Sequence, residues 1–196
     1  MIRLIFASRN PNKVGEIKAI LGPGFRIGGL EELGFHEDIP EPFHSLEENA
    51  LAKARFVHTR FGVNCFADDT GLEVNALGGK PGVQSARYAG PAKDDHANIR
   101  KLLSELSGIT DRSAQFRTVI ALILDKKEYL FGGVVRGNIT TLPVGQQGFG
   151  YDPVFIPQGY TSTFAEMEAT EKNRISHRQA AIRKLANFLQ DISGSG

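Results

Sequence analysis

The chain has 196 residues, of which 41% are hydrophobic and 23% are charged, and its formal net charge is +1. This length and composition fit a single globular domain, while the near-zero charge argues against nucleic acid or a membrane surface as a partner. The one cysteine, Cys65, cannot form an internal disulfide, and no signal peptide or transmembrane segment is recognised, so we expect a cytoplasmic protein.

The N-terminal segment predicts a strand, a loop and a helix in succession. Residues 2–7 form a short apolar run that is typical of a buried strand. Asn10 suits the N-cap of the following helix and Pro11 suits its first position. Gly22-Pro23-Gly24 is expected to end this helix.

A loop over residues 30–43 is expected next, followed by a second helix. Ser45 and Glu48 form a capping-box signature at its start. Apolar residues then recur at helical spacing and predict one buried face, made of Leu46, Ala50, Ala54, Val57 and Phe61.

Two adjacent acids, Asp68 and Asp69, close the apolar run of the second predicted strand, residues 63–69. Successive side chains of a strand point to opposite faces, so both acids can aim at one point only where the strand ends. We expect Thr70-Gly71 to supply that end, with residues 72–74 as a continuation beyond the turn. A carboxylate at the end of a strand is a common place for chemistry in α/β proteins, although a solvated turn is the simpler alternative.

The remaining chain predicts a loop at 78–82, a helix from Asp94 or Asp95, and a hairpin of strands 115–124 and 129–139 around a turn at 125–128. A loop at 145–150 and a short strand at 153–156 follow. Ser176 and Gln179 suggest a second capping box before the last helix, and residues 193–196 read as a tail. Inward-facing residues are expected to be Ile99, Leu102, Leu103 and Leu106 on the first of these helices, and Ile182, Leu185, Leu189 and Ile192 on the last. The chain therefore predicts a single α/β domain over residues 1–192 with a central mixed sheet.

The loop at residues 8–13 is a candidate phosphate site. A strand that leads through a loop into a helix N-terminus presents free N–H groups and a positive dipole end. Ser8 and Asn10 add donors and Lys13 adds a positive charge, whereas an ordinary capped turn is the structural alternative. Lys53 could also point inward toward an anion, or be solvated.

Glu41 is a candidate metal ligand because Pro40 and Pro42 stiffen the backbone on both sides of it. Mg²⁺ prefers oxygen ligands, commonly one or two carboxylates together with substrate phosphates. A surface acid in a loop is the alternative interpretation. Glu48 is explained by the capping box and is left out of the site.

Two later segments could recognise a planar base. The segment 148–153 combines glycines with Phe149 and Tyr151, so it could stack a ring and offer backbone donors, or simply form a turn with buried aromatics. His177 and Arg178 place positive charge at a helix N-terminus against the helix dipole, and Lys172 adds to it. Such a cluster is either a site for an anion or a solvated basic patch. Together with the acids, these segments indicate a nucleoside triphosphate bound with Mg²⁺.

Motifs along nearly the whole chain are similar to those of the inosine triphosphate pyrophosphatase (Ham1) family. The matching segments are residues 8–13, 48–50, 67–72, 78–82, 85–88, 148–153 and 175–178. The resemblance implies an ITPase-like (Maf/Ham1) α/β fold, with two lobes around a long nucleotide-binding cleft, and a homodimer. It also implies Mg²⁺-dependent hydrolysis of dITP, ITP and XTP to the monophosphate and pyrophosphate. The chain departs from the usual family pattern at Ser8-Arg9 and at Gln146-Gln147.

The same resemblance assigns roles to individual residues. It implies that Asp69 is the general base and a metal ligand, that Asp68 supports the metal or its waters as a second catalytic residue, and that Glu41 is a metal ligand. Substrate contacts are implied for Ser8, Arg9, Asn10, Pro11, Asn12, Lys13, Lys53, Thr70, Phe149, Gly150, Tyr151, Asp152, Lys172, His177 and Arg178.

Selectivity for the base has a physical hypothesis. Donors at the 6-oxo edge would accept hypoxanthine and xanthine but face the 6-amino donor of adenine, and an unpaired buried donor gives strong rejection. His177, Arg178 and backbone amides near Asp152 could be these donors.

Three other functions compete with this hypothesis. A Maf-type pyrophosphatase would share the fold but prefer other bases. A non-catalytic nucleotide-binding module would bind ITP without releasing pyrophosphate, and it would gain little from acids near phosphates. An RNA-binding protein is disfavoured because the chain lacks a basic stripe.

Overall fold

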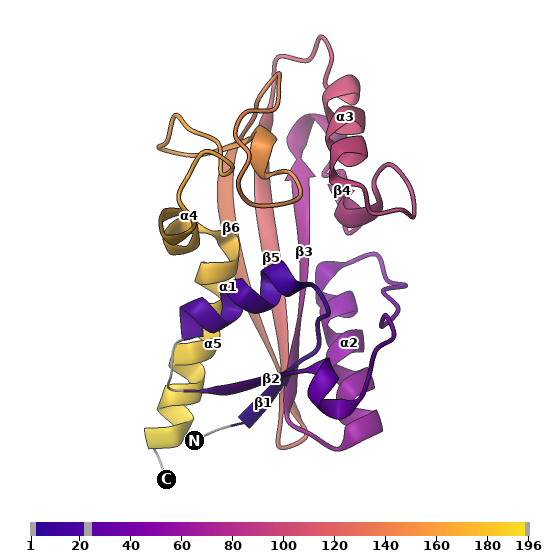
Figure 1. The fold of residues 1–196 in the computed structure, drawn as a ribbon, viewed down its shortest axis with the longest axis vertical. Helices are drawn as coiled ribbons and strands as arrows, with labels where there is room; N and C mark the ends of the chain where they lie inside the picture. Colours follow the sequence, from indigo (N-terminus) through magenta and orange to yellow (C-terminus); the bar gives the residue numbers. More distant parts are fainter. Residues whose placement is uncertain (1–2, 22–24, 195–196) are drawn as a thin grey trace. The chain divides into compact units, whose positions relative to one another are not determined.

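The computed structural model describes residues 3–21 and 25–194. The chain forms two compact units (Figure 1). Unit 1 comprises residues 1–69, 118–133 and 178–196, and unit 2 comprises residues 70–117 and 134–177. The chain passes between the units at four points, and two of them, Asp69–Thr70 and His177–Arg178, fall at predicted site residues.

The helices and strands follow one another in an α/β order. The N-terminal part contains β1 (Arg3–Phe6), α1 (Pro11–Leu21), β2 (Arg26–Gly29), the 3-10 helix η2 (Leu30–Leu33), α2 (Leu46–Phe61) and β3 (Cys65–Val74). The middle part contains η3 (Asn75–Leu77), β4 (Pro81–Gly82), η4 (Ser85–Arg87), α3 (Asp95–Glu105), β5 (Ser113–Leu124) and β6 (Lys127–Ile139). The last part contains η5 (Asp152–Val154), β7 (Phe155–Pro157), α4 (Ala169–Ile175) and α5 (His177–Gly194).

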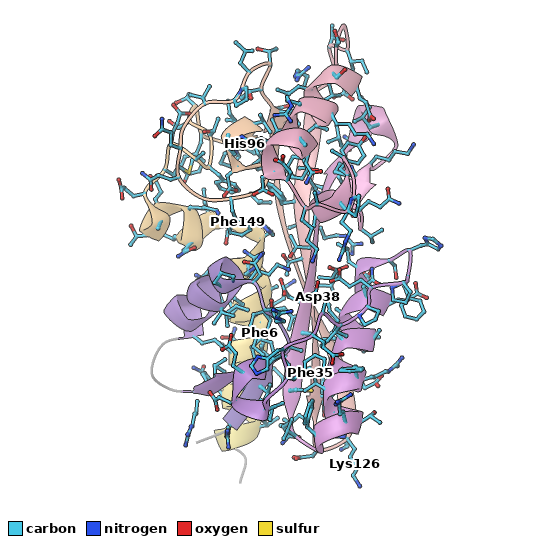
Figure 2. The ribbon with its side chains drawn as sticks, turned by 45° about the vertical axis from the view of Figure 1, so that its right-hand side comes forward. Phe6, Phe35, Asp38, His96, Lys126 and Phe149 are labelled. Atoms are coloured by element: carbon cyan, nitrogen blue, oxygen red, sulfur yellow. The ribbon has the colours of Figure 1, made fainter. Side chains whose placement is uncertain are left out.

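The strands form one mixed sheet in the order β2-β1-β3-β5-β6-β7, and β4 pairs with β3. β1 is parallel to β2 and to β3, with Ile5 opposite Cys65. β4 is antiparallel to β3, and β7 is antiparallel to β6. The hairpin between β5 and β6 turns at Asp125 and Lys126, which both have positive φ. Figure 2 labels Lys126 at this turn. The predicted mixed sheet flanked by helices is therefore confirmed.

Each unit has its own hydrophobic core. In unit 1, α1 and α5 cover one sheet face and pack on Phe6, Phe66 and Ile120. α2 lies on the other face, where the Cys65 thiol donates to the Ala54 carbonyl at 3.2 Å. In unit 2, side chains of β3, β5, α3 and the chain after β6 form a separate core around Phe116 and Phe155.

Most predicted elements are present. Asn10 caps α1, since its side chain accepts from the Lys13 N–H at 3.3 Å, and Asp94 caps α3. Ser45 caps α2, as predicted, because its side-chain oxygen accepts from the Glu48 N–H. The Ser45 hydroxyl also donates to Glu48 Oε2. The predicted helix stop at residues 22–24 lies outside the described residues.

The expected break at Thr70-Gly71 is wrong, because β3 runs unbroken from Cys65 to Val74. Gly71 is needed for a close approach instead of a turn: a Cβ there would lie 2.5 Å from the Gly82 carbonyl oxygen on β4. The acids therefore point to opposite faces of a continuous strand.

Other differences are smaller. The expected loop at 30–43 begins with η2, and β2 and α4 were not predicted. Ile192 is 39% exposed and does not face the core. α5 continues through Ser193 and Gly194, two of the four residues that the sequence assigned to a tail. Among the described helices, none is long and apolar enough to cross a membrane.

Candidate active site

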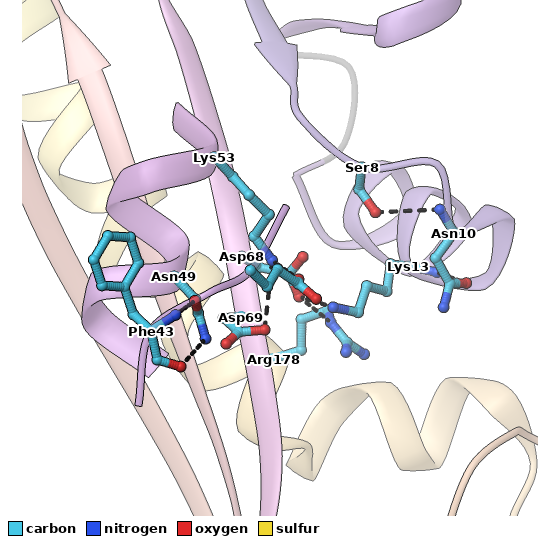
Figure 3. A network of polar contacts seen from close by, with 10 residues as sticks. Ser8, Asn10, Lys13, Phe43, Asn49, Lys53, Asp68, Asp69 and Arg178 are labelled. Carbon is cyan, nitrogen blue, oxygen red and sulfur yellow. Dashed lines mark hydrogen bonds and ion pairs between the residues drawn. The ribbon is translucent and has the colours of Figure 1, made fainter. Parts of the chain in front are cut away.

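The strand β3 presents Asp68 and Asp69 to different partners in unit 1 (Figure 3). Both side chains are buried, Asp68 almost completely at 1% exposure and Asp69 at 7%. A buried carboxylate remains ionised only where nearby cations or donors compensate its lost hydration. Each acid therefore has to be considered with the cations that it contacts.

Asp68 is held by two cations from the helices on its side of the sheet. Its Oδ2 lies 3.0 Å from Lys13 Nζ on α1 and 3.6 Å from Arg178 Nε on α5. Burial on its own would raise the pKa of Asp68, but Lys13 and Arg178 outweigh it and hold the pKa well below its usual range. Asp68 is thus a fixed negative charge that organises two cations.

Asp69 points to the α2 side and shares a lysine with Glu41. Lys53 Nζ lies 2.5 Å from Glu41 Oε1 and 3.4 Å from Asp69 Oδ1. Burial raises the pKa of Asp69; Lys53 opposes that rise and Glu41 adds to it. Lys53 itself is buried, which would lower its pKa, yet Asp69, Glu41 and Asp68 together raise it. Asp69 is therefore a more basic carboxylate than Asp68, as a proton acceptor needs to be.

The residues around Asp69 fit a hard divalent cation that substrate phosphates also coordinate. No group of three or more His, Cys, Asp or Glu side chains in the described chain could hold a metal unaided. The second oxygen of Asp69, Oδ2, is buried and has no hydrogen-bond partner among the described residues. Two carboxylates plus phosphate oxygens are a common donor set for Mg²⁺, so Glu41 and Asp69 are suitable ligands.

The loop between β1 and α1 has the predicted form. The Asn10 N–H donates to Ser8 Oγ at 3.2 Å, and Asn10 in turn caps the helix, so both side chains shape the turn. Arg9 is exposed and pairs with Asp38 at 3.4 Å. Pro11 and Asn12 form the first turn of α1. Lys13 reaches from this turn to Asp68, which places its charge beside the buried acids.

The loop that carries Glu41 is attached to α2 by Asn49. The Phe43 N–H donates to Asn49 Oδ1 at 2.9 Å, and Asn49 Nδ2 donates to the Phe43 carbonyl at 3.2 Å (Figure 3). Asn49 is buried, at 1% exposure, whereas the Phe43 side chain is exposed. Asn49 lies in the family-matching segment 48–50 but had no predicted role, because its partner is a backbone group in an irregular loop.

In unit 2, the predicted base-recognition loop is shaped by Asp152. Asp152 Oδ2 accepts from the Phe149 N–H at 2.8 Å and from Lys172 Nζ at 2.7 Å. Lys172 Nζ also lies 4.7 Å from the centroid of the Phe149 ring, within cation–π range. Gly148 has φ +77°, and a Cβ there would lie 2.1 Å from Asp152 Oδ2, so only glycine fits. Phe149, Asp152 and Lys172 thus form one local cluster.

Neighbouring residues of unit 2 support this loop. The Tyr151 hydroxyl, which is buried, donates to the Ser85 carbonyl at 2.8 Å, and burial raises the pKa of Tyr151. The Gly150 N–H donates to Asp95 Oδ2 at 2.7 Å. Tyr151 therefore braces the loop through its hydroxyl. Ser85 lies in a family-matching segment and Asp95 was a possible helix start, but neither was predicted to support this loop, since neither lies near it in sequence.

The other predicted substrate contacts are distributed between the units. His177 is buried in unit 2, and its ring stacks on Phe116 with centroids 4.8 Å apart and planes 13° apart. Thr70 is half-buried on β3 and follows Asp69 directly. Arg178, predicted beside His177 at the base, contacts Asp68 in unit 1.

Comparison with known proteins places this arrangement in a family. Residues 4–188 match the model of the Ham1 family. The chain belongs to the Ham1 family. A dITP/XTP pyrophosphatase of Porphyromonas gingivalis is 55% identical over 190 residues, covering 96% of this chain and 98% of the relative. A dITP/XTP pyrophosphatase of Flavobacterium psychrophilum is 50% identical, covering 97% of this chain and 100% of the relative.

Solved structures of Ham1 proteins have the same fold. The Staphylococcus aureus Ham1 protein matches with a TM-score of 0.89 at 41% identity, over 97% of this chain and 99% of the other. A Coxiella burnetii HAM1 protein matches with a TM-score of 0.90 at 37% identity, over 97% and 100%. The expected Ham1 fold is thus confirmed, while the roles of individual residues and the long cleft remain predictions.

Proposed function

We propose that this Ham1 protein is a nucleoside-triphosphate pyrophosphatase that hydrolyses dITP, XTP and ITP to the monophosphate and pyrophosphate. The single observation that supports it most is the pair of buried acids on β3 with different cations, Lys13 and Arg178 at Asp68 and Lys53 at Asp69. The high identity to dITP/XTP pyrophosphatases over nearly the whole chain supports the same substrates.

The two acids would have different tasks. We assign Asp69 to accept the proton of the water that attacks the α-phosphorus, because burial raises its pKa. Lys53, fixed between Glu41 and Asp69, would orient the acid and offset negative charge that builds up on the phosphoryl oxygens. Asp68 would keep Lys13 in place for the triphosphate and would act as a positioning residue.

A Mg²⁺ ion bound by Glu41 and Asp69 would neutralise charge on the phosphates and lower the barrier to departure of pyrophosphate. We propose Mg²⁺ because the donors are all oxygen and too few for a cage made by the protein alone. The protein's own part is to supply these two carboxylates from a strand and from a loop that is attached to a helix.

The base would be read by the cluster of unit 2. Phe149 can stack on a purine, and the N–H groups near Asp152 can donate to a 6-oxo group. Lys172 is committed to Asp152 and so fixes the loop instead of donating freely. Adenine would place a 6-amino donor against these donors and be rejected.

We also propose that the protein is a homodimer, as the family resemblance implies, and that it is located in the cytoplasm. Leu142 and Val144, two exposed apolar residues of one loop in unit 2, are candidate contacts. Light scattering should then give about twice the 21.4 kDa chain mass, and a monomer at micromolar concentration would exclude this assembly.

The function is tested by pyrophosphate release from a nucleotide panel. We expect rapid release from dITP, XTP and ITP, release from dATP lower by about 10²-fold or more, and no release in EDTA. Fast hydrolysis of dTTP or UTP would favour a Maf-type preference. Tight ITP binding without pyrophosphate would indicate a binding module.

A further inference from the structure

Asn49 occupies a place in unit 1 that the proposed reaction leaves unexplained. It is fully buried on α2. Its side-chain oxygen and its side-chain nitrogen both form hydrogen bonds with the backbone of one residue, Phe43, in the irregular loop before the helix. This pair of hydrogen bonds resembles the N–H and C=O pairing between neighbouring β-strands. It restricts the backbone conformation of the loop at Phe43. A buried amide satisfied in this way fixes local geometry strongly, because breaking it leaves unpaired groups.

Asn49 and Phe43 each lie close in sequence to one partner of the ion pair between Lys53 and Glu41. Asn49 and Lys53 are four residues apart on α2 and therefore share one face of the helix. Phe43 is two residues from Glu41, and the prolines at 40 and 42 restrict the backbone around that acid. One face of α2 thus contacts both the backbone of the loop, through Asn49, and the Glu41 carboxylate, through Lys53.

We propose that Asn49 is a positioning residue that holds the loop over residues 40–44 so that the Glu41 carboxylate stays beside Lys53 and Asp69. This rests on the proposed function for the reaction that it serves, but the placement itself is visible without substrate. Without these two hydrogen bonds, the backbone of the loop would be less firmly attached to α2, and the Glu41 carboxylate would be held less closely beside Lys53.

The chain offers a matched control in Asn64. Its side chain also makes a reciprocal pair in unit 1, accepting from the Asp125 N–H at 2.9 Å and donating to Asp125 Oδ1 at 3.1 Å. That pair holds the hairpin turn between β5 and β6, away from Glu41 in the bonding network. Asn64→Ala therefore shows what the loss of a reciprocal asparagine pair far from Glu41 in the bonding network does to the metal properties.

The test compares wild type, Asn49→Ala and Asn64→Ala as full-length proteins. The readouts are hydrogen exchange at the Phe43 amide, Mn²⁺ binding followed by electron paramagnetic resonance with and without a non-hydrolysable dITP analogue, and the metal concentration at half-maximal rate. For Asn49→Ala we expect faster exchange and about 10-fold weaker Mn²⁺ binding, the lower end for loss of a residue that supports a ligand. The metal requirement should rise in parallel, and Asn64→Ala should change neither metal property.

Phe43→Pro provides a second variant that does not touch the helix core. It removes the N–H that donates to Asn49 from an exposed loop position, and it should weaken Mn²⁺ binding in the same direction even if Asn49→Ala fails to fold. If Asn49→Ala showed faster exchange at the Phe43 amide but unchanged Mn²⁺ binding, the proposal would be overturned. A wild-type protein that binds no Mn²⁺ with or without the dITP analogue would also overturn it. Weakened Mn²⁺ binding in a chain that cannot hydrolyse dITP would uphold it and reject the proposed function instead.

Discussion

The two adjacent aspartates show how strongly surroundings decide the properties of a residue. Asp68 lies between Lys13 and Arg178 and is held ionised, whereas Asp69 lies with Glu41 around one shared lysine and has a raised pKa. The same side chain, one position apart on a strand, thus binds two cations in one place and has, in the other, the raised pKa that would suit a proton acceptor.

Replacing Asp68 should therefore destabilise the protein. Asp68→Asn leaves the buried Arg178 and the partly buried Lys13 without their carboxylate, and we expect a loss of about 3 kcal/mol in the free energy of unfolding at pH 7. Because the folded pKa of Asp68 is depressed, its contribution is complete above the unfolded value of about 4 and is lost as the pH falls through the folded value.

Urea unfolding of the metal-free proteins from pH 7 to pH 3 checks this. The difference in the free energy of unfolding between wild type and Asp68→Asn should become smaller as the pH falls toward 3. Asp69→Asn serves as the comparison, since the pKa of Asp69 is raised and its charge is unfavourable in the fold; it should be as stable as wild type or more so. A loss in Asp69→Asn as large as in Asp68→Asn would contradict the distinction.

At the scale of elements, the course of β3 determines where the acids point. A break at Thr70-Gly71 would have let both carboxylates face one point, but the strand is continuous and separates them. Gly71 allows this because β4 approaches closely, with the Gly82 carbonyl where a Cβ would be.

Gly71→Ala should accordingly force β3 and β4 apart. We expect about 2 kcal/mol of destabilisation, typical of overpacking against a rigid neighbour, because the clash is with backbone. Gly132→Ala on β6 is the control, since its nearest potential contact is 4.0 Å away. Urea midpoints measured for both variants decide the point, and equal midpoints would show that the close approach is unimportant.

Strong local patterns were enough to predict the long elements. The helical spacing of Leu46, Ala50 and Ala54 and the cap at Ser45 give α2 correctly, because local capping and one buried face determine it. β2 was missed because its four residues, Arg26–Gly29, have no alternating pattern; they form a strand through pairing with β1. The continuity of β3 depends likewise on a partner strand that lies apart in sequence.

The site was predictable as a list of residue types but not as a set of contacts. The acids, lysines and aromatic loop could be chosen from motifs, yet the pairing of Lys13 with Asp68 and of Lys53 with Asp69 depends on tertiary packing. Supporting residues such as Asn49 and Asp95 were missed because their bonds go to backbone groups that only the fold brings near.

At the scale of the whole molecule, the division of the chain separates two kinds of chemistry. Unit 1 contains the acids and cations suited to phosphates, and unit 2 contains the aromatic loop suited to a base. A nucleoside triphosphate has a charged tail and a planar base, so the residues of each unit, taken by themselves, suit one chemical part of such a substrate.

The most direct measurement is the rate of pyrophosphate release from dITP by wild type and by Asp69→Asn, each shown to be folded by its unfolding midpoint. If Asp69 is the proton acceptor, the variant should be slower by roughly 10²–10⁴-fold while its stability is retained. A folded Asp69→Asn protein that turns over dITP at close to the wild-type rate would contradict the account.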